Sequence, residues 1–190
     1  MKKNAALSLL LLIVLNSCGT TAFTGRKQLM VFSDESISAL SDESYAEFLK
    51  TAVISGDKQH SDMVRSVGEK MVTALTSYLS GIGQQDYLGG LGWEFQLVKD
   101  PSVNAFCLPN GKIVFFEGLL QFAGNPNHMA IVIGHEMGHA IARHGNERMS
   151  QQALLQTAGQ IATQVFGQTK YGQNAQAAEL FAQAFAFGTN

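Results

Sequence analysis

Residues 131–150, IVIGHEMGHAIARHGNERMS, place two histidines four residues apart, His135 and His139, with Glu136 directly after the first. On a helix each residue turns by about 100°, so the two imidazoles are displaced by only about 40° and lie one turn apart. Both can then reach one metal ion from the same side, and Glu136 is placed to hold a water molecule. We therefore predict a zinc site with His135 and His139 as ligands and Glu136 as the general base.

The HExxH pattern is too rare to be expected by chance in this chain, because shuffling its residues gives roughly 0.006 matches. The competing interpretation is a buried helix with two hydrogen-bonded histidines. Gly138 favours the metal site, since a glycine in a buried helix costs about 1 kcal/mol unless something needs the space. Apolar positions nearly surround this helix, which predicts that it is buried in the core.

A third protein ligand is not apparent nearby. His144 lies nine residues after His135, about 180° around a continuing helix, so it should point the other way. Glu147 is displaced by about 120° and falls on the last turn at best. Zincins with a third histidine need HExxHxxGxxH, whereas here Ala142 takes the glycine's place and His144 comes one residue early. Neither His144 nor Glu147 is predicted to bind the metal.

The hydrophobic pattern predicts the elements that position this site. Helices are expected over 33–50 and 61–79, the second with apolar residues at three- and four-residue intervals. Residues 93–100 alternate as a half-buried strand does. The segment VNAFCLPNGKIVFF, residues 103–116, is the clearest hairpin, because two apolar runs flank an Asn-Gly turn.

The second half of the chain is predicted to be helical. A short helix over 117–123 should end at Gly124, and the Asn-Pro pair that follows should open the HExxH helix. Two further helices, 148–166 and 174–187, fit the Ala- and Gln-rich end of the chain.

Length and charge limit the class of protein. The chain has 190 residues, enough for one domain with a real core, and its net charge is −2. A nucleic-acid-binding function is excluded because no basic surface is available. The two cysteines, Cys18 and Cys107, exclude a disulfide framework. Cys107 is expected to be a small buried residue.

The first 18 residues read as an export signal. A positive start is followed by LSLLLLIVL, which is too short to span a membrane comfortably. The sequence LNSC resembles the lipobox of bacterial lipoproteins, in which Cys18 is diacylated and anchors the protein to a membrane. Gly19, in place of an aspartate, indicates the outer membrane. An ordinary signal peptide with a chance cysteine is the alternative, and 19–32 is expected to be a polar tether whose end could be a short strand.

Three blocks of the sequence together resemble peptidase family M48, which holds the HtpX-like, Oma-like and CAAX-prenyl-protease metallopeptidases: TGRKQLMVFS, DPSVNAFCLPNGKIVFFEGLL and HMAIVIGHEMGHAIARHGNERMSQQ. The resemblance implies a mainly helical α+β fold of the gluzincin type, with a small antiparallel sheet or hairpin beside the HExxH helix and one zinc ion per subunit. It also implies that the strand before the turn borders the substrate through Asn104, Ala105 and Phe106. An extended peptide could pair there by strand addition.

In this family the third zinc ligand is a glutamate in an ExxxD motif on a later helix. No such motif follows His139, and Glu179 lacks an aspartate four residues on. The expectation is therefore that 33–190 is the N-terminal part of a metallopeptidase domain, with the third ligand beyond Asn190. The 190-residue polypeptide alone is then expected to be inactive.

The resemblance implies a zinc-dependent metalloendopeptidase that acts on polypeptides in bacterial envelope protein quality control, as a periplasm-facing lipoprotein of the outer membrane. Two alternatives stay open. One is a non-catalytic envelope lipoprotein that binds or scaffolds misfolded outer-membrane proteins. The other is a soluble metal-binding module that uses His135, His139 and His144. The oligomeric state is not indicated by the sequence.

Overall fold

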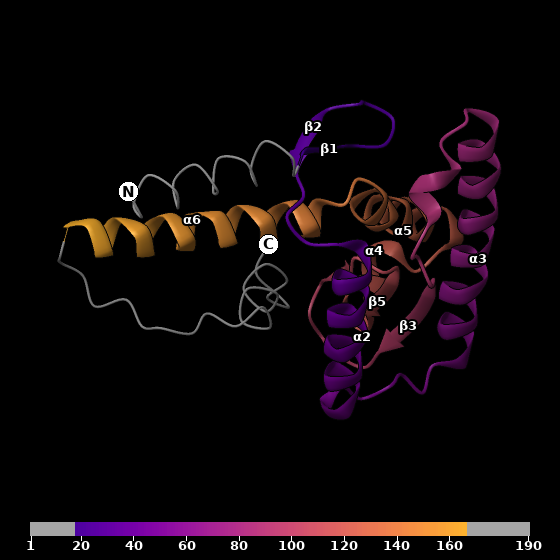
Figure 1. The fold of residues 1–190 in the computed structure, drawn as a ribbon. Helices are drawn as coiled ribbons and strands as arrows, with labels where there is room; N and C mark the ends of the chain where they lie inside the picture. The colour runs from indigo at the N-terminus through magenta and orange to yellow at the C-terminus, as the bar shows by residue number, and fades with distance from the viewer. Residues whose placement is uncertain (1–17, 167–190) are drawn as a thin grey trace.

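The computed structural model describes the backbone of residues 18–166 and the side chains of residues 19–156 (Figure 1). The predicted export signal up to residue 17, Glu179 and the helix predicted at 174–187 lie outside the described residues. In chain order the elements are β1 (Cys18–Thr20), β2 (Lys27–Leu29), α2 (Asp34–Thr51), α3 (Lys58–Gly81), η1 (Gln85–Leu88), β3 (Glu94–Val98), β4 (Ala105–Cys107), β5 (Lys112–Phe116), η2 (Glu117–Leu119), α4 (Leu120–Ala123), α5 (Pro126–Ile141) and α6 (His144–Phe166).

Side-chain caps set where the main helices begin. The Ser33 hydroxyl accepts a hydrogen bond from the Ser36 N–H at the start of α2, within one residue of the predicted start of this helix. Asp57 caps α3, which therefore begins earlier than the predicted residue 61. Asn125 caps α5 and is followed by Pro126 in the first turn, which confirms the predicted start of the HExxH helix.

A three-stranded sheet with the order β3-β5-β4 forms the centre of the fold. Strands β4 and β5 are the predicted hairpin, and Gly111 in its turn has φ 90°, a conformation that favours glycine. Strand β3, whose partner the sequence did not indicate, pairs with β5 in parallel, so the sheet is mixed and its antiparallel part is the β4–β5 hairpin. The alternating pattern of residues 93–100 places side chains on faces but does not encode the direction of the partner strand.

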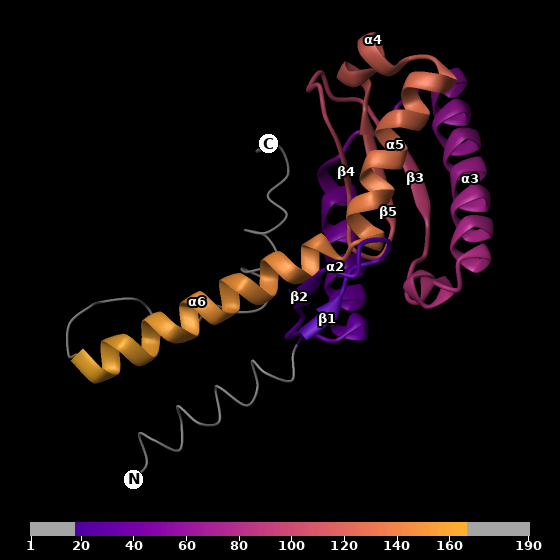
Figure 2. The ribbon, with the colours of Figure 1, turned by 90° about the horizontal axis from the view of Figure 1, so that it is seen from above.

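Helices cover both faces of this sheet. The larger apolar cluster joins α3 and α5 to one face through Val64, Leu97, Phe115 and Ile133. A second cluster packs α2 against the other face (Figure 2). The mainly helical α+β fold predicted from the sequence is thereby confirmed. Among residues 18–166, the helices are all too short or too polar to cross a membrane.

Helix α5 is buried on one side only, which corrects the prediction of a fully buried helix. Met129, Ile133 and Met137 are at most 3% exposed, whereas Ile131 is 71% exposed. His135 lies one turn after Ile131 on the same exposed side. An apolar composition shows that a helix can be buried but not which elements cover it, and no element within residues 18–166 covers this side.

Residues 19–32 are not a free tether in this structure. Strands β1 and β2 pair in antiparallel register, and the short strand expected at the end of the segment is β2. The hairpin is held to α6 by Arg26, which binds Glu147, and by the Val31 N–H, which donates to the Ser150 hydroxyl at 2.9 Å. Arg26, one of the polar residues that suggested a solvated tether, is thus the partner of an acidic residue of α6.

Cys107 is a free, buried cysteine, as predicted. Burial raises the pKa of its thiol, and the nearby Glu136 carboxylate raises it further. In a Cys18→Ser variant, which keeps Cys107 as its only cysteine, we expect a thiol reagent to label the native protein on the order of 100-fold more slowly than the urea-unfolded protein. The release of thionitrobenzoate measures both rates. Equal rates would contradict the buried position.

Candidate metal centre

The predicted ligands His135 and His139 lie together on α5. Their Nε2 atoms are 3.1 Å apart, and the ring centroids are separated by 4.7 Å. Two nitrogens bound to one tetrahedral zinc ion at about 2.0–2.1 Å would lie about 3.3–3.4 Å apart. The two Nε2 atoms therefore converge as a shared divalent metal ion requires.

The side of α5 that carries these two rings is open to solvent. His135 is exposed and His139 is half-buried. Gly138, the residue before His139, is also exposed, and a Cβ built there would meet nothing within 4 Å. Within the described part of the chain, the side of α5 that carries the histidines is therefore accessible.

Glu136 is half-buried and lies against strand β4. Burial raises the pKa of its carboxyl group, while His135 and the backbone N–H of Cys107 oppose the shift by favouring the charged form. A raised pKa makes the carboxylate a stronger base toward water. The carboxylate thus bonds to the backbone of Cys107 in β4, the strand that was predicted to border a substrate, and is close enough to His135 to feel its charge.

The pKa of His139 is lowered. The main cause is burial, and the positive charges of His135, His144 and Arg148 add to it. A lowered pKa keeps the imidazole neutral near pH 7, and the neutral ring is the form that binds metal ions.

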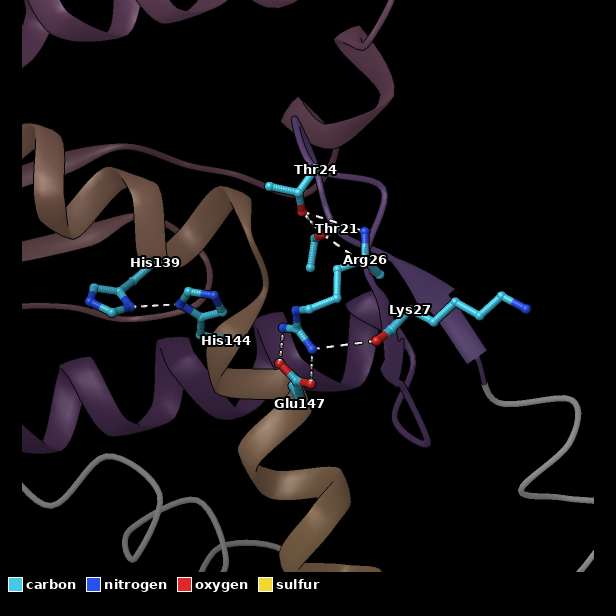
Figure 3. A network of polar contacts seen from close by, with 7 residues as sticks. All are labelled: Thr21, Thr24, Arg26, Lys27, His139, His144 and Glu147. Atoms are coloured by element: carbon cyan, nitrogen blue, oxygen red, sulfur yellow. Dashed lines mark hydrogen bonds and ion pairs between the residues drawn. The ribbon is translucent and has the colours of Figure 1, made fainter.

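His144 lies beside the site and not on the far side of the helix, so its predicted placement was wrong. Helix α5 ends at Ile141, and Arg143 adopts a left-handed conformation with φ 55° that turns the chain. His144 therefore returns toward His139, and their Nδ1 atoms are 2.8 Å apart (Figure 3). His139 therefore contacts His144 through Nδ1 and His135 through Nε2.

A complete set of protein ligands is not found in the described residues. Among residues 18–166, no three His, Cys, Asp or Glu side chains are grouped so that they could hold a metal ion. The residues present fit a zinc ion as two of its ligands, His135 and His139.

Strand β4 is an edge strand, paired only with β5 among the described strands. Ala105 and Cys107 belong to the cluster on the α5 side of the sheet. The Phe106 ring points to the opposite face, where it stacks edge-on against Phe48 at 5.4 Å. Asn104 accepts a hydrogen bond from the Phe116 N–H through its backbone oxygen. The contact of these residues with a substrate stays a prediction. Hydrogen-bonded pairs alternate along β4, so the backbone groups of Asn104 and Phe106 face β5 and those of Ala105 face the free edge.

Arg26 and Glu147 form an ion pair that the sequence did not reveal. Two hydrogen bonds of 2.7 and 2.6 Å join the guanidinium group to both carboxylate oxygens (Figure 3). The Glu147 side chain is only 13% exposed. The two residues are 121 positions apart, and no local pattern links them, so only the folded chain shows the pairing.

The stability contributed by this pair should depend on pH. The hydrogen bond from Arg26 is the largest cause that lowers the pKa of Glu147 below its ordinary value of 4.5. The stabilisation is therefore complete above the unfolded pKa and is lost as the pH falls through the folded pKa. We expect Glu147→Gln to lower the urea midpoint near pH 7, with the difference from wild type closing near pH 3.

Urea titrations at the two pH values measure this effect. The control is Glu47→Gln, which removes the carboxylate of an exposed pair with Lys50 and should leave the midpoint nearly unchanged at both pH values. A difference for Glu147→Gln that persists near pH 3 would show that another interaction of this residue is involved.

Two histidines one turn apart on a helix, with a glutamate after the first, define the HExxH class of metal sites. The model of Peptidase family M48 matches residues 59–189, more than half of the chain. The chain belongs to peptidase family M48.

Curated relatives agree with this assignment. A mitochondrial metalloendopeptidase OMA1 of Arabidopsis thaliana is 51% identical over 73 residues, which cover 37% of this chain and 15% of that protein. Metalloprotease LoiP of Escherichia coli is 30% identical over 146 residues, 77% of this chain and 51% of that protein. A beta-barrel assembly-enhancing protease of Yersinia pestis is 28% identical over 85 residues, 43% of this chain and 18% of that protein. The chain thus spans about half or less of the length of these relatives.

Proposed function

We propose that this protein is a zinc-dependent metalloendopeptidase. The observation that carries the proposal is the 3.1 Å approach of the His135 and His139 Nε2 atoms on an open helix face, with the Glu136 carboxylate on the adjacent side. Membership of the peptidase family and the names of the relatives support it.

His135 and His139 would hold the zinc ion, which when bound supplies Lewis-acid activation of water and of the scissile carbonyl. Glu136 accepts a proton from the attacking water as its oxygen bonds to the carbonyl carbon. The carbon–nitrogen bond then breaks, and Glu136 gives the proton to the leaving amine. The products are a carboxylic acid and an amine, and the carboxylate of Glu136 is regenerated.

The substrate is proposed to be an extended polypeptide that pairs with the free edge of β4. Ala105 would offer its backbone N–H and C=O at this edge, because the backbone groups of Asn104 and Phe106 face β5. Backbone groups accept any sequence in an extended conformation. Pairing of this kind suits unfolded or damaged proteins better than folded ones, because most backbone groups of a folded protein are already paired within it.

A third protein ligand is proposed to be a glutamate outside the described residues. A catalytic zinc site has three protein ligands and one open position, and residues 18–166 supply two. The family resemblance supports a glutamate from a later helix.

We also propose that Cys18 is lipidated and anchors the protein to the periplasmic side of the outer membrane, for envelope protein quality control. The LNSC sequence supports the anchor, and the name of the Yersinia pestis relative supports a role in the envelope. Because Cys18 is the first residue of β1, an acylated Cys18 would hold the domain close to the membrane surface.

Metal removal tests the proposed activity. We expect the full-length protein to cleave casein, to lose this activity completely after dialysis against a zinc chelator, and to regain it with stoichiometric zinc. Circular dichroism should show that the metal-free protein keeps its fold. Cleavage that resists chelation would refute the zinc mechanism, and binding of unfolded outer-membrane proteins without cleavage under any condition would favour the scaffold alternative.

A further inference from the structure

The contact between His139 and His144 constrains where their protons lie. The two Nδ1 atoms are 2.8 Å apart in a partly buried position, and the ring planes are inclined by 66°. Two neutral imidazoles can make this contact only if one Nδ1 carries a proton and the other accepts it. His139 presents its other nitrogen, Nε2, to His135.

Only one of the two proton arrangements leaves His139 able to bind a metal ion through Nε2. If His139 carries its proton on Nδ1, its Nε2 has a free lone pair directed toward His135, and His144 must accept through its own Nδ1. We propose that His144 is a positioning residue that holds His139 in this Nδ1–H tautomer and fixes the direction of its Nε2 atom. Hydrogen bonds to the second nitrogen of a ligand histidine commonly orient the ring and set its tautomer.

The turn before His144 is built to make this contact. Arg143 has φ 55°, which is unfavourable for a residue with a side chain. Its guanidinium group forms an ion pair with Asp34 of α2 at 2.8 Å and lies 5.6 Å from the centre of the Tyr87 ring. Two elements distant in the sequence therefore hold the left-handed residue that brings His144 back to His139.

The N-terminal hairpin also contacts the first turn of α6. Glu147, three residues after His144, donates its backbone N–H to the Arg143 oxygen at 3.1 Å, and its carboxylate binds Arg26 of the N-terminal hairpin. Figure 3 shows His144 and Glu147 at the start of α6, with His139 on one side of them and the N-terminal hairpin on the other. His144 is thus fixed on a rigid segment, as a residue that orients another side chain must be.

A role for His144 as a third ligand does not fit this geometry. Its near nitrogen contacts Nδ1 of His139, while the predicted metal position is on the Nε2 side, toward His135. His144 therefore acts on the metal through His139. This inference rests on the proposed zinc site, so its test includes a measurement that needs no metal.

A matched pair of variants tests the positioning role in the full-length protein. Asparagine places its side-chain oxygen near the position of the His144 Nδ1 atom and keeps an acceptor, whereas leucine has a similar size and no acceptor. We expect His144→Leu to raise the zinc dissociation constant by about 10- to 100-fold, and His144→Asn to keep most of the affinity. Competition with a chromophoric chelator measures the constants, and urea unfolding of the metal-free variants checks that both fold.

Equal zinc affinities in the two variants would overturn the proposal, whether both are tight or both are weak. Weak zinc binding by both variants would indicate that His144 binds the metal itself or is needed for packing. A role in packing alone cannot produce recovery by asparagine, because asparagine fills the space no better than leucine.

The metal-free wild-type protein gives the second test. With ¹⁵N-labelled histidine above the imidazole pKa, we expect His139 to show a protonated Nδ1 and an unprotonated Nε2. The opposite tautomer would overturn the proposal even if zinc binds. Failure of the wild-type protein to bind zinc would instead refute the proposed function, while the tautomer would still report on the role of His144.

Discussion

Replacing Glu136 by glutamine is expected to lower kcat/KM for peptide hydrolysis by about 10²- to 10⁴-fold without loss of zinc. The amide has nearly the shape of the carboxylate but cannot accept a proton from water. The Glu136 carboxylate accepts a hydrogen bond from the backbone N–H of Cys107 in β4 and is not one of the proposed metal ligands. The zinc affinity should therefore stay within a few-fold of wild type. The expected effect is therefore on the chemical step alone.

Two quantities are measured for the full-length wild-type protein and the Glu136→Gln variant. One is the rate of cleavage of a quenched fluorescent casein, and the other is the zinc content after dialysis. Glu69→Gln is the matched control, because it makes the same chemical change at an exposed position of α3 and should leave the rate unchanged. An active Glu136→Gln variant would remove Glu136 from the mechanism. A variant that loses its zinc would make Glu136 a ligand.

The parts of this fold that the sequence predicted correctly depend on local signals. The hairpin of β4 and β5 follows from an Asn-Gly turn between two apolar runs, and Gly111 takes the positive φ that such a turn needs. The spacing of His135 and His139 fixes their relative position as soon as the segment is helical. Such features need no information about distant residues.

The placement of His144 could not be predicted in the same way. The prediction that it points away from the site assumed that α5 continues, and no glycine or proline in residues 139–144 indicates that the helix stops. The left-handed Arg143 is held by Asp34 and Tyr87, which are far away in the sequence. Contacts between distant elements thus decide the local backbone at this point.

The pairing of β1 and β2 and their contact with α6 were not predicted, for a related reason. Residues 19–32 are polar, and a polar segment with few apolar positions resembles a solvated linker. In the structure, the segment forms the β1–β2 hairpin and Arg26 pairs with Glu147. The sequence shows that such residues can make hydrogen bonds but does not show their partners.

Gly118 is expected to be the position where the smallest substitution has the largest effect on stability. A Cβ added there would lie 2.0 Å from the backbone oxygen of Pro101 and 2.5 Å from that of Ser102. Backbone atoms cannot move aside as a side chain can, and the Gly118 N–H also donates to the Asp100 oxygen at 2.9 Å. We expect Gly118→Ala to lower the free energy of unfolding by about 3 kcal/mol.

The displaced loop leads directly into β4, so the same substitution should also reduce catalysis. Asn104 ends this loop and accepts the Phe116 N–H, and moving it would shift the strand that lies against Glu136. Urea unfolding of the metal-free protein measures the stability, with Gly81→Ala as the control, because a Cβ at Gly81 meets nothing within 4 Å. The control should be neutral or slightly stabilising, since alanine favours the helical conformation by up to about 1 kcal/mol. Equal effects at both glycines would mean that the loop at 100–104 does not pack against Gly118. Another contact would then have to hold β4 beside the proposed metal centre.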